Sequence, residues 1–152
     1  MSTRREVLAQ GASLAAALAG LGLLPQAAQA AWSQAAFEAK TMSDLMKALG
    51  TSGPAESKDV SITGPDIAEN GAVVPVGAAT TLAGAKRLLL LVEKNPAMLA
   101  AAFDLSDAVE PNISTRVKMG QSSNVFAVAI TADNKVLYAV KEIKVTLGGC
   151  GG

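Results

Sequence analysis

The sequence contains no histidine, one cysteine and few aromatic residues, and each shortage excludes a class of function. Histidine is the commonest metal ligand and general base, so the chain cannot build a Ser–His or Cys–His couple. The single cysteine, Cys150, cannot form an internal disulfide. Basic and acidic residues balance at 13 each without a long run of either sign, which argues against a polybasic surface for nucleic acid or membrane lipid.

The carboxylates are dispersed, and no pair of them has the spacing of a catalytic or metal site. Asp104 and Asp107 are closely spaced, but the remaining positions of a calcium loop are absent. We therefore predict no catalytic residue, no metal ligand set and no resident cofactor.

Residues 1–30, "MSTRREVLAQGASLAAALAGLGLLPQAAQA", have the pattern of a cleaved export signal. A charged start precedes an apolar stretch of about 18 residues, the lower limit for a membrane-spanning helix, and Ala28-Gln29-Ala30 forms a small-x-small cleavage site. The adjacent Arg4 and Arg5, followed by Val7 and Leu8, resemble the twin-arginine motif, with Val7 where phenylalanine is more usual and Ala9 where a lysine often follows. We predict export to the periplasm by the twin-arginine route, without a membrane anchor.

The domain that follows, residues 31–147, begins with helical spacing and then changes to strand spacing. Residues 33–49 carry apolar side chains at helical intervals, with Ser33 as N-cap and Gly50 as the stop, and predict one amphipathic helix. Alternating or short apolar runs predict strands at residues 59–63, 72–78, 87–93, 114–119, 124–131 and 135–147. In the stretch 97–105 the alanine content favours a helix and the position favours a strand, and we predict a strand.

Short strands separated by turn signals, after one helix, predict a mainly β protein. The expected fold is an immunoglobulin-like antiparallel β-sandwich. Asp133-Asn134 is the expected hairpin turn between the last two strands. Pro75 interrupts a strand pattern and predicts an edge strand or a bulge, because proline cannot donate to the ladder.

Cys150 stands in "GGCGG", directly after the last predicted strand. The residues on both sides of Cys150 are glycines, namely Gly148, Gly149, Gly151 and Gly152. They have no side chains and permit many backbone conformations. We predict a flexible arm over residues 148–152 that can enter a narrow active site on another protein. An exposed thiol has a pKa near 8.5, so the activation has to come from the partner.

Two stretches resemble the SoxY family, namely the ending "VTLGGCGG" at residues 145–152 and "PDIAENGAVVPV" at residues 65–76. The resemblance covers essentially the whole chain, including the export signal. It implies an immunoglobulin-like sandwich, a heterodimer with SoxZ and covalent attachment of sulfur intermediates to Cys150. It also implies transient docking to haem-containing SoxAX for oxidative loading, to SoxB for release of sulfate and, where present, to SoxCD for oxidation of the remaining sulfur.

Two other functions are consistent with parts of the sequence. A ubiquitin-like sulfur carrier also ends in Gly-Gly but holds sulfur as a thiocarboxylate on the terminal glycine. That chemistry requires ATP-dependent activation in the cytoplasm, and the export signal argues against it. A structural protein could instead use Cys150 for a disulfide between two copies.

Overall fold

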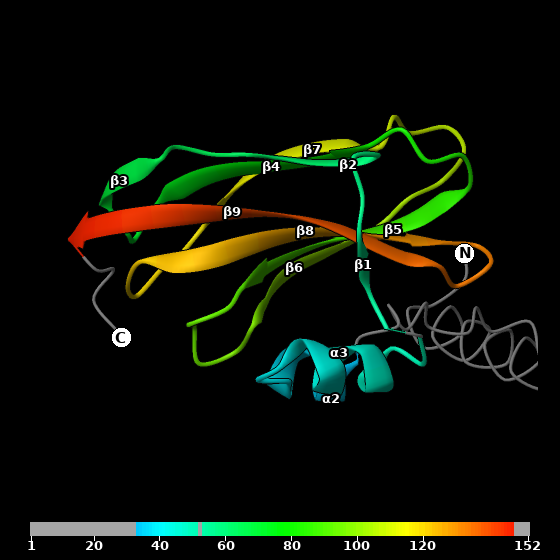
Figure 1. Cartoon of the computed structure of the whole chain (residues 1–152), viewed down its shortest axis with the longest axis horizontal. Helices are drawn as coiled ribbons and strands as arrows, with labels where there is room; N and C mark the ends of the chain where they lie inside the picture. Colours follow the sequence, from blue (N-terminus) through cyan, green and yellow to red (C-terminus); the bar gives the residue numbers. More distant parts are fainter. Residues whose placement is uncertain (1–32, 52, 148–152) are drawn as a thin grey trace, which may run out of the picture. The chain divides into compact units, whose positions relative to one another are not determined.

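The computed structural model describes residues 33–51 and 53–147 (Figure 1). The predicted export signal and the predicted arm lie outside these residues. In chain order the elements are α2 (Gln34–Glu38), α3 (Met42–Ala48), β1 (Ala55–Glu56), β2 (Val60–Thr63), β3 (Ile67–Asn70), β4 (Val74–Thr80), β5 (Ala85–Val92), β6 (Leu99–Asp104), β7 (Asn112–Val117), β8 (Ser123–Thr131) and β9 (Val136–Leu147).

The strands form two layers, as the alternating sequence pattern predicted. The larger sheet has the order β1-β9-β8-β5-β6, and β3 also pairs with β9. The second sheet has the order β2-β4-β7, and it lies over one face of the larger sheet in Figure 1. The predicted fold class, a mainly β protein built from two packed sheets, is confirmed.

Two short strands, β1 and β3, both run parallel to β9, so the larger sheet is not purely antiparallel. β9 has 12 residues, which is long enough for β1 to pair near its start and β3 near its end. The sequence pattern predicted neither strand. β1 has two residues, and β3 lies between turn signals, so neither is long enough to show a clear alternation.

Two hydrophobic cores meet at β5, which is buried on both faces. Leu88, Leu90 and Val92 enter the core between the sheets. Leu89 and Leu91 enter a second core, where α2 and α3 cover the outer face of the larger sheet (Figure 1). A strand buried on both faces needs apolar residues at successive positions, which explains the run "LLLLV".

Residues 33–49, predicted to form one helix, form two. The prediction of a single continuous helix was wrong. The Ala39 carbonyl accepts a hydrogen bond from the Met98 N–H at 3.2 Å, so a tertiary contact replaces the next helical bond. Thr41 then caps α3 by accepting from the Asp44 N–H at 3.1 Å. Ser33 caps α2 as predicted, and Gly50 follows α3 with φ of 67°. Neither helix is long and apolar enough to span a membrane, within residues 33–51 and 53–147.

The remaining strand predictions are confirmed apart from the position of Pro75. The alanine-rich stretch contains β6, and Asn134, with φ of 61°, forms the turn between β8 and β9. Pro75 is not on an edge strand, because β4 is the central strand of its sheet. It is tolerated there because β2 pairs with β4 only from Gly77 onward, which leaves Pro75 opposite Arg116 of β7 alone.

Candidate functional site

The segment that leads to Cys150 is the end of β9. Cys150 and its four glycines lie outside the described residues, so the site can be described up to Leu147. The pairing of β9 with β8 ends at Ile143, opposite Ser123. On the other side of β9, β3 pairs with its last residues, Ile67 lying opposite Lys144 and Asn70 opposite Leu147. In Figure 1, β3 lies beside the end of β9.

Hydrogen bonds hold both sides of this last segment of β9. The Val145 N–H, which points away from β3 and beyond the end of β8, donates to the Ser122 hydroxyl at 2.9 Å. The Lys144 N–H donates to the Asp66 carbonyl at 3.0 Å. The Thr146 hydroxyl donates to the Glu69 carbonyl at 3.1 Å. The backbone is therefore anchored on both sides up to the residue that precedes the glycines.

Lys141 and Asp66 form an ion pair beside this segment, with Nζ and Oδ1 2.7 Å apart. The hydrogen bond from Lys141 and then its positive charge lower the pKa of the Asp66 carboxyl from its ordinary value. No pattern in the sequence assigns Lys141 a role. The two residues are 75 positions apart, and only their parallel packing brings them together.

The loops at the same end of the sandwich are tied to one another. Asn70 accepts the Ala72 N–H through Oδ1 at 2.9 Å, which stabilises the turn after β3. The Gly71 carbonyl in that turn accepts the Met119 N–H at 2.7 Å. The Asn95 side chain donates to the Lys118 carbonyl, also at 2.7 Å. These hydrogen bonds tie the turn after β3 and the loop after β5 to the segment between β7 and β8.

The carboxylates considered as metal ligands are engaged in ion pairs. Asp104 accepts from Arg87 at 2.6 Å, and Asp107 accepts from Lys86 at 2.9 Å. No group of three or more Cys, Asp or Glu side chains is placed to hold a metal ion in the described part of the chain.

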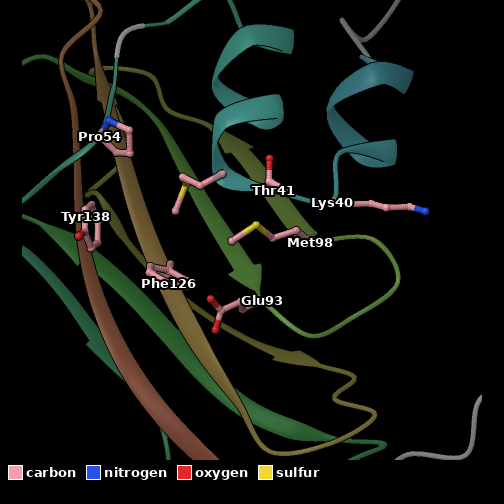
Figure 2. Close-up of a pocket in the computed structure, with 8 residues that line it drawn as sticks. Lys40, Thr41, Pro54, Glu93, Met98, Phe126 and Tyr138 are labelled. Atoms are coloured by element: carbon pink, nitrogen blue, oxygen red, sulfur yellow. The ribbon is translucent and has the colours of Figure 1, made fainter.

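A cavity of about 330 Å³ opens on the outer face of the larger sheet, beside the helices (Figure 2). Its lining residues are Lys40, Thr41, Met42, Pro54, Glu93, Met98, Phe126 and Tyr138. The rings of Phe126 and Tyr138 pack at a centroid distance of 5.7 Å with an interplanar angle of 60°. No sequence pattern predicts this cavity, because its lining residues come from distant segments of the chain.

The aromatic part of this cavity lies far from the end of β9. Tyr138 and Leu147 both lie on β9, and the strand between them extends about 30 Å. Three residues from Leu147 to Cys150 span at most about 10 Å. Cys150 therefore cannot reach Tyr138 of the same molecule, and the candidate site is the end of β9 itself.

Comparisons with known proteins relate this chain to solved structures and to one protein family. No curated protein sequence matches the chain. Two structures of superoxide reductase (neelaredoxin) from Ignicoccus hospitalis, both of single-residue variants, are 19% and 16% identical to it, with TM-scores of 0.52 and 0.51. They cover 60% and 65% of this chain and 82% and 86% of their own. At such identity the likeness shows a shared fold alone.

Two further matches are more specific. The structure of the sulfur carrier protein SoxY from Chlorobium limicola f thiosulfatophilum is 33% identical, with a TM-score of 0.63. The alignment covers 71% of this chain and 97% of that protein. The family model described as sulfur oxidation protein SoxY matches residues 45–150. This chain therefore belongs to the SoxY family of sulfur oxidation proteins.

Proposed function

We propose that this chain is the sulfur carrier of periplasmic thiosulfate oxidation and that Cys150 holds the sulfur compound covalently. The observation that carries the proposal is the family match, which runs from α3 through β9 to Cys150. The anchored end of β9 supports it, because a rigid base restricts the volume that a short arm can search. Gly148 and Gly149 precede the thiol, and Gly151 and Gly152 follow it, so no bulky neighbour blocks its entry into a narrow site.

The proposed loading step joins two sulfur atoms and releases two electrons. The Cys150 thiolate and thiosulfate form Cys–S–S–SO₃⁻, and the two electrons pass to a haem-containing oxidase of the SoxAX type. Hydrolysis by a SoxB-type enzyme then adds water to the terminal sulfur. It releases sulfate and two protons and leaves Cys–S–S⁻ on the carrier. Where SoxCD exists, it oxidises the remaining sulfur.

In this proposal the carrier itself performs no catalysis and binds no cofactor. It contains no histidine to serve as a base or metal ligand, so the partner enzymes supply the redox and hydrolytic chemistry. SoxZ is the proposed permanent partner, forming a heterodimer. The twin-arginine-like signal at residues 1–30 supports a periplasmic location.

The test is intact-mass measurement after thiosulfate and the SoxAX-type oxidase are added to the purified carrier. We expect the native chain to gain the mass of one thiosulfate and the Cys150→Ser variant to gain nothing. Loading that persists in the variant would favour a thiocarboxylate on the terminal glycine. A uniform disulfide dimer that reductant cannot convert into a loadable carrier would favour the structural alternative.

A further inference from the structure

The strand β7 forms an open edge of the smaller sheet. It pairs with β4 along its whole length and with no other strand among the described residues. Its sequence, "NISTRV", is rich in β-branched residues and contains neither proline nor lysine, and its pairing with β4 shows no register shift. Proline, lysine and bulges are common means of preventing an edge strand from pairing with another chain. β7 has none of the three.

Other edge strands are shorter or less regular. β6, at the edge of the larger sheet, has a register shift in its pairing with β5, and the Met98 N–H just before it donates to the Ala39 carbonyl beside the helices. β2 has four residues, and the N–H of its first residue, Val60, already donates to the Ser57 carbonyl. β1 has two residues and β3 has four. β7 is therefore a regular edge that stays open over six residues.

Hydrogen bonding next to β7 shows which of its backbone groups point outward. The Thr80 N–H of β4 donates to the carbonyl of Pro111, which directly precedes β7, at 3.0 Å. In an antiparallel ladder the direction of the N–H and C=O groups alternates, so every second residue after Pro111 bonds to β4. The residues between them, Asn112, Ser114 and Arg116, direct these groups away from β4. Their side chains are exposed on the outer face of the sheet.

These three residues complement a second copy of the same strand. If Ser114 lies opposite Ser114 of the second copy, the two residues exchange N–H···O bonds, and each Arg116 N–H donates to the opposite Asn112 carbonyl. The Asn112 N–H is not needed, because it donates to the Glu110 carbonyl at 2.7 Å. On the exposed face, each Arg116 guanidinium then lies beside the side-chain amide of Asn112. A register with Arg116 opposite Arg116 would instead oppose like charges.

We propose that the open edge of β7 pairs with β7 of a second copy of this chain, across a two-fold axis and with Ser114 at its centre. The two small sheets then form one continuous antiparallel sheet. This inference goes beyond the proposed function and does not depend on Cys150. The contact is small and made mainly by backbone groups, so the dimer is a reversible one.

The proposed dimer separates the two predicted arms. The Met119 N–H, just after β7, donates to the Gly71 carbonyl in the turn after β3, and β3 pairs with the end of β9. The ends of β7 and β9 therefore lie at the same end of the sandwich. Since the two copies of β7 run antiparallel, the ends of the two β9 strands point in opposite directions. Each Cys150 is thus presented to partner enzymes separately.

The test measures self-association of the chain carrying Cys150→Ser, which excludes a disulfide between copies, together with any subunit that co-purifies. Sedimentation equilibrium from about 1 µM to 1 mM gives the dissociation constant of the dimer. Ser114→Pro removes an outward N–H and no bond to β4, and should weaken the dimer about tenfold or more. Ser114→Ala keeps that N–H and is the matched control, with an unchanged dissociation constant.

Charge changes at Asn112 test the register independently. Asn112→Asp places a carboxylate beside Arg116 of the second copy and should tighten the dimer about fivefold. Asn112→Lys places like charges together and should weaken it by about the same factor. Hydrogen exchange of the Arg116 amide should also become slower as the protein concentration rises, with the Ser114→Pro variant showing no such change.

Three results would overturn the proposal. A monomer at every concentration would show that the edge stays open, and an unchanged dissociation constant in Ser114→Pro would place the contact on another surface. Loss of a co-purifying subunit from Ser114→Pro would assign the edge to that subunit. Thermal unfolding within about 2 °C of native excludes misfolding. If Ser114→Pro unfolds, the Asn112 variants decide alone, and equal dissociation constants for Asn112→Asp and Asn112→Lys would reject the pairing.

Discussion

At the scale of single residues, the pairing of Lys141 with Asp66 connects the charge state of one carboxyl to the end of β9. Lys141 lies on β9, and Asp66 immediately precedes β3. The Asp66 carbonyl also accepts the Lys144 N–H, so this residue contacts β9 through both its side chain and its backbone. The protonation of Asp66 thereby becomes linked to the docking of β3.

This linkage predicts that the difference in stability between the native chain and the Lys141→Met variant depends on pH. The folded-state pKa of Asp66 is lowered below its ordinary value of 3.8, mainly by the hydrogen bond from Lys141. The stabilisation of the folded chain by this ion pair is complete above pH 3.8. It is lost as the pH falls through the lowered pKa of Asp66. The difference in unfolding temperature between the two proteins should therefore be present at neutral pH and shrink on acidification.

NMR titration of the Asp66 carboxyl gives the direct measurement of this effect. Its midpoint should move to higher pH in Lys141→Met. Lys144→Met is the control, because Lys144 is exposed on the same strand and makes no ion pair among the described residues. Equal Asp66 midpoints in the native chain and Lys141→Met would contradict the assignment.

At the scale of elements, β9 is longer than its neighbour β8. Where the pairing between the two strands stops, the backbone N–H groups of β9 need another hydrogen-bond acceptor. The last pair between them is Ser123 with Ile143. Two residues later the Val145 N–H is accepted by the Ser122 side chain, which takes the place of a backbone carbonyl. One hydroxyl thus extends the ordered strand toward the predicted arm.

We predict that Ser122→Ala loosens the end of β9 without unfolding the domain. Removing the acceptor leaves the Val145 N–H without its partner, at a cost of about 1 kcal/mol in the free energy of unfolding. Hydrogen exchange of the Val145 amide should become faster than in the native chain. Ser114→Ala is the control, since Ser114 is exposed on β7. Native protection of the Val145 amide in Ser122→Ala would show that the hydroxyl is not its effective acceptor.

At the scale of the whole molecule, two cores hold the described residues together, and the last side chain assigned to either of them is Val145. The core between the sheets includes Ile143, with Val145 packed against it, and the second core joins the helices to the outer face of the larger sheet. In the proposed function the sulfur compound attaches at Cys150, outside the described residues that form these two cores.

This separation predicts the result of two truncations. Removal of residues 148–152 should abolish loading and leave the unfolding temperature within about 2 °C of native. Removal of residues 144–152 also deletes Val145 and the residues that pair with β3, and should lower the unfolding temperature by about 5 °C or more. Thermal unfolding followed by circular dichroism measures both. A large destabilisation by the shorter deletion would show that the arm contributes to the folded domain.

The strands with a clear pattern were predictable because the polarity of successive residues shows which faces of each strand are buried. The alternation of β8 and β9 and the apolar run of β5 identified the layers, and Ser33, Gly50 and Asn134 marked ends and turns. The break between α2 and α3 was not predictable, since it depends on the Met98 N–H, just before β6, donating to the Ala39 carbonyl. The position of Pro75 likewise depended on how far β2 extends along β4.

By itself, the sequence determined the mainly β class, the absence of histidine chemistry, the candidate Cys150 and the family resemblance, because these depend on residue identity and local spacing. The tertiary structure alone decided which residues surround the end of β9. β3 and Ser122 reach it from separate stretches of the chain. Such contacts arise from the pairing of strands that are distant in sequence, and no local pattern encodes that pairing.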